Sequence, residues 1–233
     1  LTVDNEENID KILNEFDNNI ISIDMNLQTK ITIAAPDFSI DYNSKLMMLG
    51  SCFAENMGGK FSYYKFDVDV NPCGIIYNPL SVANVLRLIM EGKPFGKDDL
   101  RKVGEKWVSL YHHGAFSSTD PEECLRRINE RLERATRELR SLDLLVITWG
   151  TAWVYKHVGE NLVVSNCHKI PSQEFERSRL SVEDIVKEYV ELIGRLREIN
   201  PGLRVLFTVS PIRHWKDGAH GNQLSKATLL LAI

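Results

Sequence analysis

Residues 46–61 read Leu-Met-Met-Leu-Gly-Ser-Cys-Phe-Ala-Glu-Asn-Met-Gly-Gly-Lys-Phe, and this stretch decides the fold class. Its first four residues form a short, continuous apolar run, which is typical of a strand buried on both faces of a parallel sheet. Gly50 ends the run, Ser51 follows, and we expect a helix over residues 52–61. Gly58 and Gly59 weaken that helix prediction, because each glycine costs about 1 kcal/mol relative to alanine in a helix interior.

The same alternation of apolar strand and amphipathic helix continues along the chain. Further strands are expected at residues 68–70, 142–148 and 203–209, with a short strand at 107–111 and a hairpin formed by 153–158 and 162–164. Helices are expected at residues 79–90, 121–139 and 182–199, and from residue 222 to the end. Asp120 and Ser181 are suited to cap two of these helices. The order predicts an α/β protein, a three-layer α/β/α sandwich around a parallel sheet.

The amino-acid composition argues against several classes of partner. The chain has 233 residues, 43% of them hydrophobic and 26% charged, with a net charge of −4. An acidic balance argues against a nucleic-acid partner, since the arginines of 121–139 alternate with glutamates as on a solvated helix face. No apolar stretch approaches the roughly 18 residues of a membrane span, so we expect no membrane partner. The cysteines lack a C-x-x-C pair, and neither they nor the histidines have the spacing of a metal site.

The N-terminal residues differ from the rest. Residues 1–24 are acidic and rich in asparagine, without the features of a signal peptide. We interpret 1–24 as an extension of doubtful origin, which includes a short helical pattern, and 25–233 as a single α/β domain starting at Met25. Reduced thiols and a cytoplasmic location are the expectation, although an even number of cysteines also permits disulfides.

Polar or glycine-bearing segments follow the predicted strands. They are residues 50–52, 71–78, 149–151 and 210–221. In an open parallel sheet, ligands bind beyond the carboxyl ends of the strands, so these segments are the candidate active site. Ser51 lies directly after a strand and opens a helix, whose free N–H groups suit an oxyanion. Serine is also a common N-cap, and spacing alone favours that structural role.

Several motifs, in order, resemble one known family. They are Met48–Asn56 (MLGSCFAEN), Asn71–Pro79 (NPCGIIYNP), Thr148–Tyr155 (TWGTAWVY), Asn166–Lys169 (NCHK) and Ser210–His214 (SPIRH). On these residues the chain from about Ile31 onward resembles the GSCFA family, which is similar to the SGNH (GDSL-like) hydrolases. The resemblance implies a flavodoxin-like sheet and a serine esterase without a cofactor. Ser51 would be the nucleophile, and the substrate a small-molecule or carbohydrate ester.

The resemblance also suggests residues for the oxyanion hole. Gly74 is the best match for a glycine that supplies a backbone N–H, although a turn with positive φ explains it equally well. In the SGNH superfamily, a Gly-x-Asn block supplies an asparagine side chain to the oxyanion hole. Here Gly150 is followed by Thr151 and then by an alanine, which stands where the asparagine belongs. Thr151, Asn78 or Asn166 would then take the place of the missing asparagine, or the hole would be weaker.

The general base is the main departure from the SGNH pattern, because a serine hydroxyl needs an adjacent base. Asp217 and His220 match the Asp-x-x-His pair by letter, and His214 is a second candidate for the pocket. Relatives continue to their own Asp-x-x-His pair, so we expect the chain to lack the last strand and helix, with the true pair past Ile233. The alternative function is a non-catalytic binding module that keeps the cleft.

Overall fold

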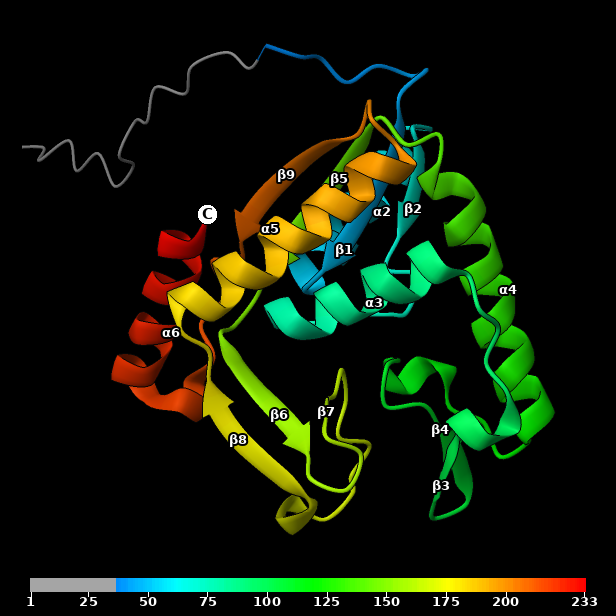
Figure 1. Cartoon of the computed structure of the whole chain (residues 1–233), viewed down its shortest axis with the longest axis vertical. Helices are drawn as coiled ribbons and strands as arrows, with labels where there is room; N and C mark the ends of the chain where they lie inside the picture. The colour runs from blue at the N-terminus through cyan, green and yellow to red at the C-terminus, as the bar shows by residue number, and fades with distance from the viewer. Residues whose placement is uncertain (1–36) are drawn as a thin grey trace, which may run out of the picture. The chain divides into compact units, whose positions relative to one another are not determined.

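Four parallel strands form the central sheet (Figure 1). They are β1 (Lys45–Gly50), β2 (Asp67–Val70), β5 (Leu144–Trp149) and β9 (Arg204–Val209), in the spatial order β2-β1-β5-β9. Successive parallel strands therefore lie in the order 2-1-3-4, as in flavodoxin-like doubly wound sheets. This computed structural model describes residues 37–233, so the helical pattern predicted within residues 1–24 lies outside the described residues.

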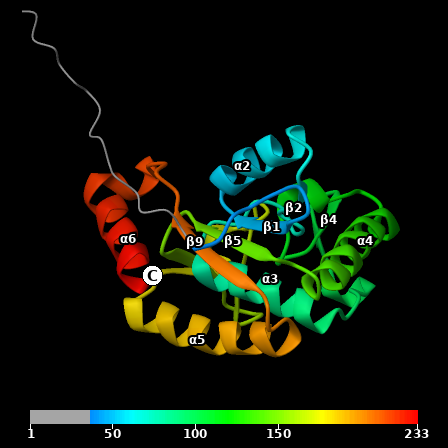
Figure 2. The same ribbon diagram turned by 90° about the horizontal axis from the view of Figure 1, so that it is seen from above.

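Helices cover both faces of the sheet, as the alternating pattern predicts (Figures 1 and 2). α2 (Cys52–Tyr63) lies on one face, and α3 (Pro79–Glu91), α4 (Pro121–Leu139) and α5 (Val182–Ile199) lie on the other. α6 (Gly218–Ala232) packs beside α5 and the edge strand β9. The core includes Met47 and Trp149, which are buried between the sheet and the layer of α3, α4 and α5. The predicted three-layer α/β/α class is confirmed.

Two smaller antiparallel sheets extend beyond the central one. β6 (Trp153–His157) pairs with β7 (Leu162–Val163), which confirms the predicted hairpin, and also with β8 (Phe175–Arg179). The sequence missed β8 because its Phe-Glu-Arg-Ser-Arg residues are mostly polar and exposed. β3 (Arg101–Val103) pairs with β4 (Lys106–Val108), so the strand expected at 107–111 is shorter. Short 3₁₀ helices are η1 (Lys97–Asp99), η2 (Gly114–Phe116), η3 (Ser172–Glu174) and η4 (Trp215–Asp217).

Helix ends follow local chemistry where a cap is present. Asp120 accepts a hydrogen bond from the N–H of Glu122, and Ser181 and Asp184 form a reciprocal capping box at the start of α5. α6 begins at Gly218, four residues before the predicted start at Asn222. Its first turn holds two glycines and no side-chain cap, so sequence signals could not place its start.

The glycine pair of α2 has a packing explanation. Gly58 is buried, and a Cβ built there would lie 2.4 Å from Cγ2 of Val70 on β2. A Cβ on Gly59 would meet no atom within 4 Å. Gly58 therefore allows α2 to approach β2, whereas Gly59 only weakens the helix.

His112 is buried and packs against aromatic side chains in the interior. It is 1% exposed, its Nδ1 lies 2.9 Å from Oγ of Ser109, and its ring contacts Phe95 and Phe116. Burial, and then the neighbouring His168, lowers the pKa of His112 to about 3. Among residues 37–233, no cluster of His, Cys, Asp or Glu has the arrangement to hold a metal, and the cysteines carry free thiols. Within the same range, no helix is both long enough and apolar enough to cross a bilayer.

We expect Gly58→Ala and Gly59→Ala to change stability in opposite directions. The first should lower the free energy of unfolding by about 1–3 kcal/mol, because the added methyl overlaps Val70. The second should raise it by about 0.5–1 kcal/mol, because it improves an exposed helix position. Urea unfolding of the two variants measures the difference, and equal stabilities would contradict the packing of α2 on β2.

Stability should also fall as the pH drops from 6.5 toward 3. The unfolded chain protonates His112 near pH 6.5, but the folded chain protonates it only near pH 3. This histidine alone then contributes a slope of about 1.4 kcal/mol per pH unit within that window. Urea unfolding of the wild type and of His112→Asn between pH 7 and pH 5 tests this. An unchanged slope in the variant would contradict a neutral buried His112.

Candidate active site

The structure places Ser51 and Gly150 side by side, where strand order reverses. Ser51 follows β1 and Gly150 follows β5, and these two strands are neighbours in the sheet. A Cβ built on Gly150 would lie 3.4 Å from the Cβ of Ser51, so the two residues are in contact. In doubly wound sheets, this switch point between strands is where ligands bind.

Ser51 is held in a defined geometry at the start of α2. Its N–H donates to the carbonyl of Thr148 at 3.1 Å, and its Oγ accepts a hydrogen bond from the N–H of Phe53 at 3.3 Å. The residue is 1% exposed. The structural role as an N-cap is therefore present, and the hydroxyl lies at the positive end of a helix dipole.

Asn71 holds the segment that precedes Ser51, a role for which no separate pattern in the sequence is visible. Its Oδ1 accepts from the N–H of Gly50 at 2.9 Å, and its Nδ2 donates to Oε2 of Glu55 at 2.7 Å. Its own N–H donates to the carbonyl of Met48 at 2.9 Å. Asn71 has a φ of 44°, in the left-handed region that asparagine tolerates better than most residues.

Gly74 forms a tight turn in this structure, and its backbone N–H is already engaged in a hydrogen bond. Its N–H donates to the carbonyl of Asn71 at 2.7 Å, and its φ is 81°. A Cβ at this position would lie 2.3 Å from the Cβ of His113. A tight turn therefore uses both the conformation and the donor of Gly74, which favours the turn reading, and the role of its N–H in an oxyanion hole stays a prediction.

One cavity of about 430 Å³ brings together several residues singled out from the sequence. They are Asn78, Thr151, Asn166, His214 and Asp217. The three candidates for the oxyanion hole, Asn78, Thr151 and Asn166, each have a side-chain hydrogen bond within the protein. The side chain of Asn78 binds Ser81 at the start of α3, Thr151 Oγ1 lies 3.1 Å from Ser225 Oγ, and Asn166 Oδ1 accepts from the N–H of His168.

Aromatic and cationic side chains also line this cavity. The guanidinium of Arg177 lies 4.0 Å from the ring centroid of Trp153, and Lys216 donates to the hydroxyl of Tyr155 at 2.9 Å. Nε1 of Trp153 and Oγ of Ser165 are buried and have no hydrogen-bond partner among residues 37–233. Trp149, the other tryptophan beside Gly150, packs in the core and hydrogen-bonds to Tyr189.

The Asp217–His220 pair predicted from its spacing does not form. Asp217 is nearly buried and makes an ion pair with Arg177 on β8, whereas His220 is exposed on the first turn of α6. Because α6 starts at Gly218, the three-residue spacing falls on a helix start and not on a loop. Within residues 37–233, no hydrogen bond or ion pair joins Asp217 or His220 to Ser51, and their catalytic role stays a prediction.

His214 is linked to the serine through Tyr77 and Gly150. Its ring packs edge-on against Tyr77, with centroids 5.8 Å apart, and a Cβ on Gly150 would lie 3.1 Å from Cδ1 of Tyr77. Burial and the charge of Lys226 lower the pKa of His214, partly opposed by Asp217 and by hydrogen bonding with Gly150. His214 is therefore neutral at physiological pH and has the protonation state of a general base.

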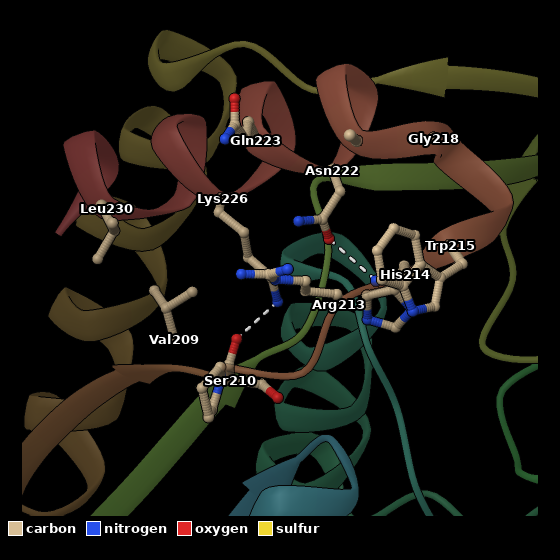
Figure 3. Close-up of a pocket in the computed structure, with 12 residues that line it drawn as sticks. Val209, Ser210, Arg213, His214, Trp215, Gly218, Asn222, Gln223, Lys226 and Leu230 are labelled. Atoms are coloured by element: carbon tan, nitrogen blue, oxygen red, sulfur yellow. Dashed lines mark hydrogen bonds between the residues drawn. The ribbon is translucent and has the colours of Figure 1, made fainter. Parts of the chain in front are cut away.

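Lys226 also reaches this region, although the sequence did not single it out. Its Nζ donates to the carbonyls of Gly150 and Ser210, at 2.5 and 2.6 Å. Burial lowers its pKa. Figure 3 shows Lys226 descending from α6 toward the segment that follows β9. A lysine in the middle of an amphipathic pattern carries no sequence signal for such a contact, which depends on the packing of α6 beside β9.

Comparison with known proteins identifies the family. The family model described as the GSCFA family matches residues 45–233. This range includes the central sheet, the antiparallel sheet of β6, β7 and β8, and the lining of the cavity that contains Thr151 and Asn166. No curated protein and no solved structure matches the chain. Since the match spans well over half of the sequence, the chain belongs to the GSCFA family.

Proposed function

We propose that this protein is an SGNH-type serine hydrolase that cleaves an ester through Ser51. The observation that carries the proposal is the position of Ser51. It opens α2 at the switch point of the sheet, in contact with Gly150. A nucleophile placed there has helix N–H groups and a positive dipole end beside it. Those groups suit the negative charge that develops on a carbonyl oxygen under attack.

In this proposal Ser51 Oγ bonds to the acyl carbon and the alcohol leaves with a proton, giving an acyl-enzyme. Water then attacks the acyl carbon and regenerates the serine. Donors from the first turn of α2 hold the oxyanion, because the N–H groups of Gly74 and Gly150 already bind Asn71 and Tyr77. Ser51 is 1% exposed, so substrate access requires a movement, and we assign it to Tyr77, which lines the cavity.

The proposed base is either His214 or a pair that lies past Ile233. His214 is favoured among the described histidines because it packs on Tyr77 and is kept neutral. The sequence resemblance favours a downstream Asp-x-x-His pair. No cofactor enters the proposal. The donor-rich cavity that contains Thr151, Asn166 and Arg177 suits the alcohol part of a small ester or an acylated carbohydrate.

A second candidate, a binding module without catalysis, has one observation in its favour. Ser51 is buried and its Oγ has a hydrogen bond from a backbone N–H, with no histidine bonded to it in the described residues. The same cavity would then serve binding alone.

Hydrolysis of p-nitrophenyl acetate separates the two candidates. Ser51→Ala should lower kcat by at least about 10³-fold, since removal of a nucleophile leaves only binding and oxyanion effects. Ser62→Ala, at an exposed position of the same helix, is the matched control and should leave the rate unchanged. If His214 is the base, kcat/KM should fall with decreasing pH only below the usual pKa of histidine, because the pKa of His214 is lowered, and His214→Gln removes that limb.

The assay is repeated on a version of the chain extended past Ile233, which tests the downstream pair. A rate that is equal in wild type and Ser51→Ala would rule out Ser51 as the nucleophile. Absence of turnover in both folded versions would favour the binding module.

A further inference from the structure

A second cavity lies between α6 and the segment that follows β9 (Figure 3). Its volume is about 390 Å³. His214 lines both this cavity and the one that holds Thr151 and Asn166. The two cavities therefore meet at a residue that packs against Tyr77, beside Gly150.

The charged lining of this second cavity has one sign. Its charged residues are Arg213 and Lys226, which line it together with the neutral His214 and the amides of Asn222 and Gln223, and no aspartate or glutamate is among its lining residues. In the described part of the chain, Arg213 has no ion pair. Lys226 uses two of its three N–H donors on the carbonyls of Gly150 and Ser210, which leaves one for a ligand.

Apart from Ser210, the remaining lining residues are apolar. In Figure 3, Val209 and Leu230 lie at one end of the cavity, and Arg213 and Lys226 lie next to them toward its middle. Leu230 is 62% exposed, so an apolar ligand group could bury part of it. A bare inorganic anion would satisfy the cations but would leave this apolar end unfilled. A short hydrocarbon chain with one negative end fits both parts.

Gly150 links this cavity to Ser51. Its carbonyl accepts from Lys226 at 2.5 Å, and its Cα side faces Ser51, with 3.4 Å between a built Cβ and the Cβ of the serine. A group bound at Lys226 is therefore one residue away from the proposed nucleophile. Such a position suits the acyl part of a substrate, while the donor-rich cavity receives the alcohol part.

We propose that the cavity of Arg213 and Lys226 binds a carboxylate that ends a short acyl chain. The preferred substrates are then half-esters of a dicarboxylic acid, such as a succinyl ester, and not simple acetyl esters. The proposed anion site is supported by the lining residues of the cavity alone. Its proposed role in binding the acyl chain rests on the proposed function. Hydrolysis of a half-ester follows the same two steps at Ser51 and needs no further reactant.

Isothermal titration with succinate, succinamide and inorganic phosphate tests the site without turnover. Succinate should bind, and Arg213→Gln and Lys226→Met should each weaken it at least about tenfold, because each removes a charge-assisted hydrogen bond. Arg197→Gln makes the same charge change on an exposed turn of α5 and should leave affinity unchanged. Arg213 is exposed, so its variant is expected to fold even if Lys226→Met does not.

Several outcomes would overturn the proposal. They are the absence of succinate binding, equal binding of succinamide, equal binding of inorganic phosphate, or an equal loss in Arg197→Gln. Ser51→Ala should bind succinate as the wild type does. If succinate binds while ester hydrolysis is independent of Ser51, the anion site stands and the proposed reaction fails. If hydrolysis depends on Ser51 but succinate does not bind, the reaction stands and the acyl subsite fails.

Discussion

The side chain of Asn71 is the contact on which the geometry around Ser51 depends. It joins the ends of two neighbouring strands and the first turn of α2, through the N–H of Gly50 and the carboxylate of Glu55. The backbone N–H of Asn71 adds a third bond, to the carbonyl of Met48. Because these groups are buried or half-buried, each would lose more by going unpaired than a surface hydrogen bond is worth. Ser51 is therefore set on a rigid support at the end of the sheet.

The two cavities meet at His214, which lines both of them. Tyr77 packs against His214 and contacts Gly150, and Gly150 in turn contacts Ser51. The ion pair of Arg177 with Asp217 joins β8 to the start of α6. The antiparallel sheet of β6, β7 and β8 is thereby connected to the C-terminal helix, and both contribute lining residues to the cavities. The Asp-x-x-His spacing occurs by letter in this chain, but in this structure Asp217 pairs with Arg177 and not with His220.

The parallel sheet and the helices could be predicted from the sequence because their signals are local. Apolar runs mark the buried strands, and Asp120 and Ser181 mark helix starts through bonds to residues two or three positions away. β8 and the start of α6 could not be predicted, since polar residues and glycines are held there by tertiary contacts.

Ser51 is a candidate nucleophile from the sequence alone, through its place after a strand and its motif. Asn71, Tyr77 and Lys226 were missed because their roles arise only when distant segments meet.

Intact-mass measurement after treatment with a fluorophosphonate tests most directly whether Ser51 is an activated nucleophile. The experiment uses the folded 233-residue chain, a version extended past Ile233, and Ser51→Ala of each. The account predicts a single adduct that disappears in Ser51→Ala, and labelling of the 233-residue chain itself would assign the base to His214. An adduct that persists in Ser51→Ala, or no adduct on either folded version, would contradict the hydrolase assignment.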